Sequence, residues 1–349
     1  MKVKDYQLKD REKAILRFVI HQFIMTANPV GSRNISKKYD LGLSPASIRN
    51  VMADLEDLGF LNHPHTSAGR IPTDRGYRVY VDSLMDPPKL ESEVKKIVEM
   101  NLTSASSETE DLLKITSGIL SELTNQLAMV TYPKFEQAVL EKIQIVQLSS
   151  QRILVVVSVN SGLIRTITLE IDAEVSEDNL TTVQQFLNEQ LAGLRFSEIR
   201  TSLHERVKDF NAERYRPIIR VFLESVDKIF TDMSSDKTFI SGTKNILKQP
   251  EFENHDHFQS VIELVENKDV IIHILDKNKP GINEVAITIG EENQDEKFSD
   301  YSMITKDYKA GDLTGTIGIM GPKRMDYSKI VAAVVYIAEQ LTQELTKQR

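Results

Sequence analysis

The sequence contains no cysteine, which excludes disulfides, thiolate metal sites and thiol redox sensing. It also lacks any apolar run of the roughly 18 residues that a membrane-spanning helix requires. The opening segment, MKVKDYQLKDREK, has no apolar stretch of the kind found in signal peptides. We therefore expect a cytoplasmic protein without membrane association.

An excess of positive charge is missing too, because the net charge is −8. The charge is uneven, however: residues 1–88 hold 13 Lys and Arg against 10 Asp and Glu, whereas the rest hold 30 against 41. A weakly basic head on an acidic body fits a small nucleic-acid-binding module joined to a control module, although chance asymmetry would also give +3. With 349 residues, the chain should form two or three domains.

What the N-terminal part does contain is a series of short helices with clear boundaries. An apolar repeat predicts a first helix over residues 8–26. Ser32 is a candidate N-cap for a second helix, residues 33–39, which would turn Lys37 and Lys38 outward.

The third predicted helix begins with Ser44 as N-cap and Pro45 at its first position, and it ends at Gly59. Its apolar stripe comprises Ile48, Val51, Met52, Leu55 and Leu58. Ser47 and Asn50 then lie on the opposite face, flanked by Ala46 and Arg49. Small and polar residues near the start of such a helix suit close approach to DNA base edges.

A short hairpin follows the third helix. Residues 60–63 predict one strand, residues 64–69 a turn-rich loop, and Arg70 with Ile71 a second strand before a helix capped at Thr73 or Asp74. This order is typical of a winged helix-turn-helix, with Arg70 beside the wing tip. A small helical domain packed for other reasons remains the alternative for the helices alone.

Several motifs in this region are highly specific in combination. They are P-V-G-S-R, L-S-P-A-S-I-R-N, M-A-D-L-E, P-H-T-S-A-G-R-I-P-T-D and G-Y-R, together with the C-terminal stretch GTIGIMGPKRMDYSKIVAAVVYIAEQLT. The chain closely resembles the bacterial heat-inducible transcription repressor family HrcA over nearly its whole length, least through about 190–270. Val51, where we expect an acidic residue, and Asn28, where Glu or Gln is usual, depart from the family pattern.

The resemblance implies a negative regulator of heat-shock (class I chaperone) operons. Such a repressor is a homodimer that binds an inverted-repeat operator, the CIRCE element, and depends on the GroEL chaperonin for activity. The implied fold is α+β and multidomain: an N-terminal winged helix-turn-helix and a GAF-like domain interrupted by an inserted dimerisation domain. On this basis we expect a winged helix over 1–88, a linker and helix over 89–104, a discontinuous GAF-like domain over 105–192 and 269–349, and the insertion over 193–268.

Sequence periodicity in the body gives the expected elements individually. Helices are predicted over 90–100, 111–130, 176–192, Tyr215–Ile229 and 326–346, and strands over 136–148, 151–159, 165–171, 269–275, 283–290 and 313–320.

The residues expected to bind DNA fall into three sets. Those expected at base edges are Ala46, Ser47, Arg49 and Asn50. Those expected at phosphates or in the minor groove are Arg33, Lys37, Lys38 and Arg70. The cap and the wing tip add Ser44, His65, Thr66 and Ser67.

We expect no catalytic residue, cofactor or metal site. His63 and His65 lack a carboxylate or cysteine at ligand spacing, and His255 with His257 fit a solvated loop better than a ligand pair. The basic pair in GPKR (321–324) fits a turn better than an anion site. Two other functions stay open: a metabolite-sensing regulator that uses the GAF-like domain, and an enzyme with an accessory DNA-binding head.

Overall fold

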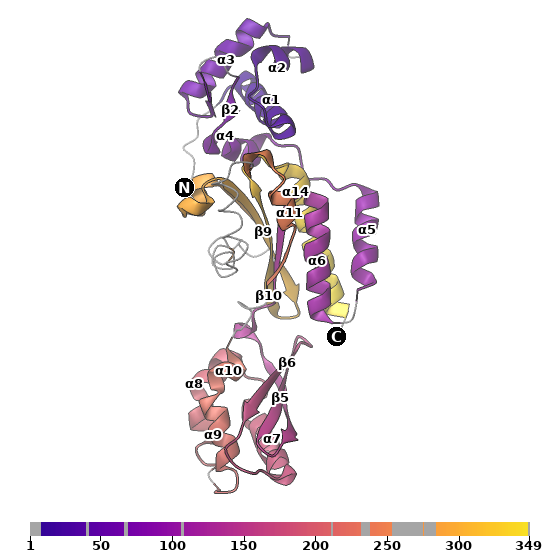
Figure 1. The fold of residues 1–349 in the computed structure, drawn as a ribbon, viewed down its shortest axis with the longest axis vertical. Coiled ribbons are helices and arrows are strands. Elements are labelled where there is room, and N and C mark those ends of the chain that lie inside the picture. The colour runs from indigo at the N-terminus through magenta and orange to yellow at the C-terminus, as the bar shows by residue number, and fades with distance from the viewer. Residues whose placement is uncertain are drawn as a thin grey trace.

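The structure, a computed structural model, describes residues 8–39, 42–65, 69–105, 108–210, 212–231, 238–252, 275 and 284–347. The molecule is elongated, with an N-terminal helical module at one end, a sheet covered by long helices in the middle and a second sheet at the other end (Figure 1). It is an α+β fold, as predicted. Within the described residues, no helix is long and apolar enough to cross a membrane.

The N-terminal module consists of three helices, a two-stranded hairpin and a fourth helix. These are α1 (Asp10–Thr26), α2 (Ser32–Lys38), α3 (Pro45–Asp57), β1 (Leu61–Asn62), β2 (Ile71–Pro72), α4 (Asp74–Val79) and a π-helical turn, η1 (Tyr80–Leu84). The predicted helices and hairpin are thus present. The N-cap predicted at Ser32 is wrong, because Gly31 occupies the cap position in extended conformation and Ser32 is already helical.

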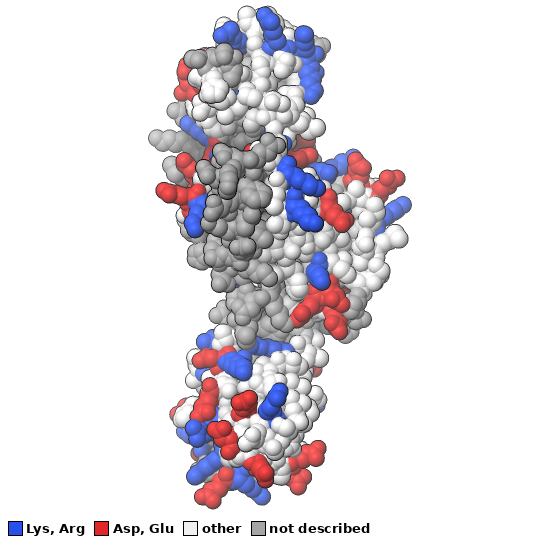
Figure 2. Space-filling model, viewed as in Figure 1, with Lys and Arg blue, Asp and Glu red and all other residues white. Residues whose placement is uncertain are grey.

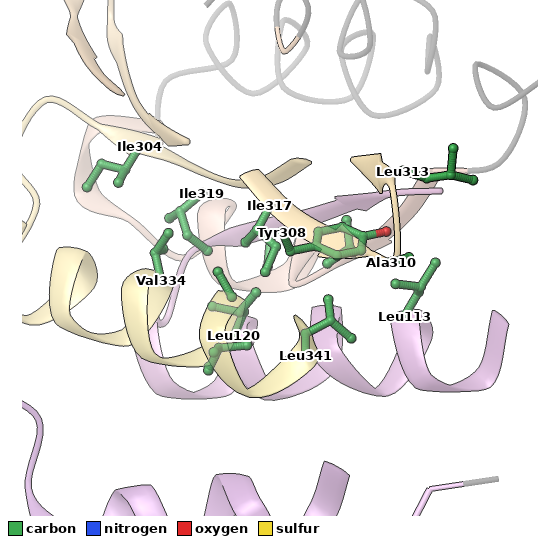
Figure 3. Packing of buried hydrophobic residues seen from close by; sticks show 14 of the residues in the cluster. Leu113, Leu120, Ile304, Tyr308, Ala310, Leu313, Ile317, Ile319, Val334 and Leu341 are labelled. Carbon is green, nitrogen blue, oxygen red and sulfur yellow. The ribbon is translucent and has the colours of Figure 1, made fainter. Parts of the chain in front are cut away.

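The middle of the molecule is a five-stranded antiparallel sheet. Its strands, in spatial order, are β7 (Thr238–Ser241), β3 (Leu127–Thr131), β10 (Leu313–Pro322), β9 (Tyr301–Ala310) and β8 (Val285–Ile289). Helices α6 (Thr109–Thr124) and α14 (Tyr327–Lys347) pack on one face, and α5 (Ser92–Thr103) lies outside them. Leu120 and Leu341 from the two helices point toward Ile317, Ile319 and Tyr308 of the sheet (Figure 3).

The opposite face of this sheet carries a smaller cluster of buried apolar side chains. It includes Leu127, Met129, Phe298, Met303 and Met320. Ile246 of α11 (Thr243–Ile246) and Phe298 of η6 (Glu296–Phe298) belong to this cluster, and the chain also forms the short turns η4 (Pro250–Phe252) and η5 (Gly290–Asn293). Both faces of the sheet therefore contribute to the core.

The far end of the molecule has its own three-stranded antiparallel sheet. Strands β4 (Leu140–Ser149), β5 (Arg152–Val159) and β6 (Ile164–Glu170) pair in that order and follow the short turn η2 (Phe135–Gln137). One face packs against α7 (Glu177–Leu191), α8 (Phe196–Val207), α9 (Arg216–Glu224) and α10 (Val226–Phe230). We refer to residues 140–230 as the distal unit.

The pairing corrects the expected grouping of the strands. We expected strands within 136–171 to share a domain with those near the C-terminus, but among the described strands they pair in a sheet of their own, through two local hairpins. Alternating sequence patterns predict a strand but do not say which sheet it joins.

Two further boundaries differ from prediction. The helix expected over 111–130 ends at Thr124, because Asn125 adopts a left-handed conformation with φ of 53° and the chain turns into β3. The helix expected over Tyr215–Ile229 is interrupted at Ser225. The strand expected over 269–275 lies outside the described residues except for Leu275, which is helical.

Candidate nucleic-acid interface

The first turn of α3 is fixed by an N-cap and is exposed to solvent. Ser44 Oγ accepts a hydrogen bond from the Ser47 amide at 3.1 Å, and Pro45 occupies the first helical position, as predicted. The buried stripe of α3 consists of Ile48, Val51, Met52 and Leu55. Fixing this stripe inward leaves Arg49 and Asn50 exposed on the outside of the module.

The other candidates on α3 differ in how freely they are presented. Ala46 and Ser44 are exposed, whereas Ser47 is half-buried and its Oγ accepts a hydrogen bond from Ser44 Oγ at 3.0 Å. Ser47 therefore contributes to the cap in this structure, beside the more open positions Arg49 and Asn50.

Helix α2 carries the second group of candidates. Arg33, Lys37 and Lys38 are all exposed, and Lys38 Nζ donates a hydrogen bond to Gln22 Oε1 of α1 at 2.7 Å. Among the residues that the structure describes, Arg33, Lys37 and Arg49 have no ion-pair or hydrogen-bond partner for their side chains. Lys and Arg side chains gather over the outer end of the module (Figure 2).

The wing is a minimal hairpin whose base is tied to the start of α2. Leu61 pairs with Pro72 and Asn62 with Ile71, and the Val30 and Arg70 backbones exchange two hydrogen bonds of 2.9 Å. His65 is exposed, but Thr66 and Ser67 at the tip lie outside the described residues.

Arg70 does not extend freely from the wing. Its side chain is 22% exposed, and its Nε lies 2.6 Å from Glu56 Oε2 in the last turn of α3, an ion pair whose angle is too poor for a hydrogen bond. The other oxygen of the same carboxylate contacts His63 Nδ1. His63 has no carboxylate at ligand spacing in the sequence, but the fold brings Glu56 to it across the turn after α3.

Comparison with known proteins decides the family. Residues 110–331 match the family model described as the HrcA protein C-terminal domain. The chain is 37% identical over 351 residues to the heat-inducible transcription repressor HrcA of Chlorobium phaeobacteroides (strain BS1), covering 98% of this chain and 99% of the relative. It is 39% identical to the same repressor of Chlorobaculum parvum, covering 96% and 97%.

This chain belongs to the HrcA family. HrcA proteins are heat-inducible transcription repressors, not enzymes, so the chain is a transcription repressor. A solved structure described as a hypothetical protein at 2.2 Å resolution has the same overall fold, with a TM-score of 0.62 at 21% identity, covering 98% of this chain and 100% of that one.

In this HrcA chain, a network of charged side chains joins the N-terminal module to the middle sheet. Arg78 of α4 donates hydrogen bonds to the Ile287 carbonyl of β8 at 2.6 Å and to Glu292 Oε1 at 2.9 Å. Burial opposes the charge of Arg78, but its bonds to Glu292 and Asp82 outweigh that cost and raise the pKa of Arg78 above its ordinary value.

The turn between β10 and α14 forms the other half of this junction. Lys323 Nζ lies 2.8 Å from Asp74 Oδ1, and Asp74 Oδ2 accepts a hydrogen bond from the Glu291 amide at 3.1 Å. Arg324 donates to the Ile24 carbonyl of α1 at 2.7 Å and to Glu251 Oε1 at 2.6 Å. The basic pair of GPKR thus lies in a turn, as expected, and binds the N-terminal module.

Glu56, Asp74 and Arg78 were missed from sequence, although each lies within a motif that carries the family resemblance. Glu56 closes M-A-D-L-E, Asp74 closes I-P-T-D and Arg78 closes G-Y-R. The motifs marked the positions, but their partners are up to 250 residues away, so spacing alone could not assign them.

Other candidate chemistry has little support in the described part of the chain. No group of three His, Asp or Glu side chains there could hold a metal ion. His255 and His257 lie outside the described residues. A cavity of about 540 Å³ lies in the distal unit beside α8 and α9, and its lining includes the apolar residues Val207, Phe210 and Ile219 and the polar residues His204 and Arg216.

Proposed function

We propose that the chain represses heat-shock (class I chaperone) operons by binding an inverted-repeat operator of the CIRCE type as a homodimer. The observation that carries this proposal is the exposure of Arg49 and Asn50 on α3 beside Arg33 and Lys37 of α2, whose side chains have no partner among the described residues. A helix with an exposed polar N-terminal half, flanked by free cations, matches a recognition helix and its phosphate contacts.

In this proposal the two helices have different roles. Arg49 and Asn50 read base edges by paired hydrogen bonds, and Ala46 with Ser47 permits close approach of the backbone. Arg33, Lys37 and Lys38 bind phosphates, and Ser44 and the wing residues His65, Thr66 and Ser67 contact the adjacent backbone.

The outer face of the three-stranded sheet supports the homodimer. Val146, Leu148 and Ile164 are 48%, 51% and 60% exposed, and register puts Leu154 and Val156 between the outer strands on the same face. An apolar patch of this kind on a sheet indicates a protein interface. We propose that two copies of the distal unit pack through this face and form the inserted dimerisation domain.

The edges of this sheet are already occupied, which favours face-to-face packing. Asn188 of α7 bonds both the Ile143 amide, at 2.7 Å, and the Ile143 carbonyl, at 2.8 Å, while Gln184 accepts from the Ile145 amide. At the opposite edge, Lys228 Nζ donates to the Thr168 carbonyl at 3.4 Å. Side chains thus cover edges that could otherwise pair with another strand.

The middle sheet with α5, α6 and α14 forms the GAF-like domain in this proposal. The family resemblance implies that repressor activity depends on the GroEL chaperonin, and in this proposal the GAF-like domain receives that signal. A partner that prefers the DNA-binding state of the repressor raises the population of that state by mass action. We propose that the repressor acts in the cytoplasm, where it has access to chromosomal DNA.

A gel shift on an inverted-repeat duplex, at several salt concentrations and with or without GroEL, tests the proposal. We expect a dimer-sized complex, weak with the purified repressor alone and stronger with chaperonin, and much weaker binding to a scrambled duplex. Binding that is equal on both duplexes would contradict sequence-specific repression, and binding that ignores chaperonin would contradict the proposed regulation.

The second candidate is a winged-helix regulator whose GAF-like domain senses a metabolite. The cavity of about 540 Å³ could hold a small molecule, but the distal unit lines it, not the middle sheet. This candidate predicts thermal stabilisation and release from DNA by a small molecule, with no effect of chaperonin.

A further inference from the structure

One carboxylate connects the recognition helix to both strands of the wing. Glu56 lies in the last turn of α3, and its two oxygens face His63, directly after β1, and Arg70, directly before β2. Exposure of the three side chains is 20%, 37% and 22%, so this group is partly shielded from water. Among the described residues, no other side chain of α3 bonds to the wing.

The neighbouring acids show that this contact is specific to one position. Asp54 and Asp57 on the same helix are exposed, and neither side chain has a recorded partner in the described chain. They are ordinary surface charges, whereas Glu56 is turned inward and paired. A partly buried charge is costly unless it is paired, which here requires both wing residues to keep their places.

The base of the wing leaves little room for adjustment. The Val30 and Arg70 backbones are bonded to each other, and a side chain at Gly69 would overlap the Val30 backbone. Movement of the wing relative to α3 would therefore disturb the contacts of His63 and Arg70 with Glu56.

A carboxylate on a DNA-binding module also repels phosphate. By charge alone, Glu56 weakens binding to every DNA sequence. We therefore look for a way in which its inward position could favour binding to the operator. A fixed angle between α3 and the wing supplies that gain only where both elements fit the DNA at once, which is at the operator.

We propose that Glu56 is a positioning residue for operator recognition, which fixes the wing on α3 by holding His63 and Arg70. In this account Arg70 is committed to Glu56 rather than serving as a free phosphate contact. The inference rests on the proposed binding of DNA by this module and adds a determinant of specificity to it.

The full-length Glu56→Gln variant tests this because the two effects predict opposite changes in operator affinity. Loss of a negative charge alone tightens binding to operator and scrambled duplexes equally. Loss of positioning lowers the ratio of operator to scrambled affinity. We expect that ratio to fall at least tenfold, with binding to the scrambled duplex unchanged or up to several-fold tighter.

Asp57→Asn is the matched control, since it removes the same charge from the same helix without a wing contact. We expect its affinity ratio to stay within twofold of the wild-type ratio. A Glu56→Gln ratio within twofold of wild type, or an equal gain on both duplexes, would overturn the proposal.

Hydroxyl-radical footprinting separates positioning from a general loss of structure. Glu56→Gln should lose protection where the wing lies while keeping protection under α3; loss of both together would reject the positioning role. In an Arg70→Gln background, Glu56→Gln should have little further effect on the ratio, because both changes break one contact; full additivity would contradict it. Wild-type protein that fails to discriminate the operator would instead reject the proposed function.

Discussion

The outer end of the N-terminal module and the outer face of the distal sheet are both exposed, at opposite ends of the molecule (Figure 1). The first exposes cations and an amide, Arg33, Lys37, Arg49 and Asn50, on helices whose apolar stripes are buried. The second exposes apolar side chains, with Val146, Leu148 and Ile164 about half exposed or more. The contrast teaches that the two ends suit different partners: a polyanion and another apolar surface.

The surface joining the N-terminal module to the middle of the molecule resembles neither end. It includes ion pairs and hydrogen bonds to backbone atoms, centred on Asp74, Arg78 and Arg324, together with a ring contact between Tyr77 and Tyr327. Directional contacts of this kind fix an orientation more than they add stability. The orientation of the N-terminal module relative to the proposed dimer surface therefore depends in part on these polar contacts.

The largest expected effect comes from a charge placed on the apolar end. Val146→Asp should separate the proposed dimer. Operator affinity should then fall on the order of a hundredfold or more, because the second DNA-binding module is no longer held close to its half-site by the first. Analytical ultracentrifugation and gel shift would measure the two losses. Thr181→Asp adds the same charge on exposed α7 and should leave both unchanged; a Val146→Asp dimer that still binds normally would reject this surface.

A smaller effect is expected from the polar end itself. Asn50→Ala should cost about 1–3 kcal/mol of operator binding and relax sequence preference at one position of each half-site. Competition with single-substituted operators gives that preference directly. The dimer should persist, which separates this variant from Val146→Asp. An unaltered preference would remove Asn50 from the set of base contacts.

The junction offers an effect of similar or smaller size, measured on stability. Gly290 has φ of +57°, and a side chain there would overlap the Asp74 carboxylate. Gly290→Ala should therefore displace Asp74 from Lys323 and the Glu291 amide, lowering the free energy of unfolding by about 1–3 kcal/mol. Hydrogen exchange should increase in α4.

Gly118→Ala provides the matched control for this prediction. Gly118 lies within α6 with open space around the position of a Cβ. The same substitution there should stabilise the protein by roughly 0.5–1 kcal/mol, since glycine is a poor helix former. A similar gain in stability from Gly290→Ala would mean that neither the positive φ nor the contact with Asp74 opposes a side chain there.

Sequence alone was a good guide where local physics determines structure. The Ser44 cap, Pro45 and the apolar stripe identified α3 and its exposed face, and Asn50 and Arg49 followed from them. Strand β9 was missed because Lys306 and Asp307 interrupt its apolar pattern, although Lys306 is only 9% exposed in the fold. Strand β3 was missed because its five apolar or small residues continue the pattern of α6.

The features that the sequence did not predict depend on contacts between distant segments. Nothing local distinguishes Glu56, which contacts His63 and Arg70, from Asp57, whose side chain has no partner among the described residues, because both lie in the last turn of α3. Likewise, β4, β5 and β6 were correctly predicted as strands, but they were grouped in one domain with the C-terminal strands and in fact pair in a separate sheet, since pairing depends on tertiary contacts.

The smallest expected effect sharpens the comparison between a free cation and a paired one. Arg33→Ala removes a cation without a partner in the described chain, so the slope of log affinity against log salt should decrease by about one. Lys38 bonds to Gln22, so Lys38→Ala should change the slope less. Both variants should weaken operator and scrambled duplexes to the same degree, because phosphates carry no sequence information. A loss confined to the operator would instead assign Arg33 to a base edge. It would contradict the proposal that α2 contacts only phosphates while α3 reads the bases.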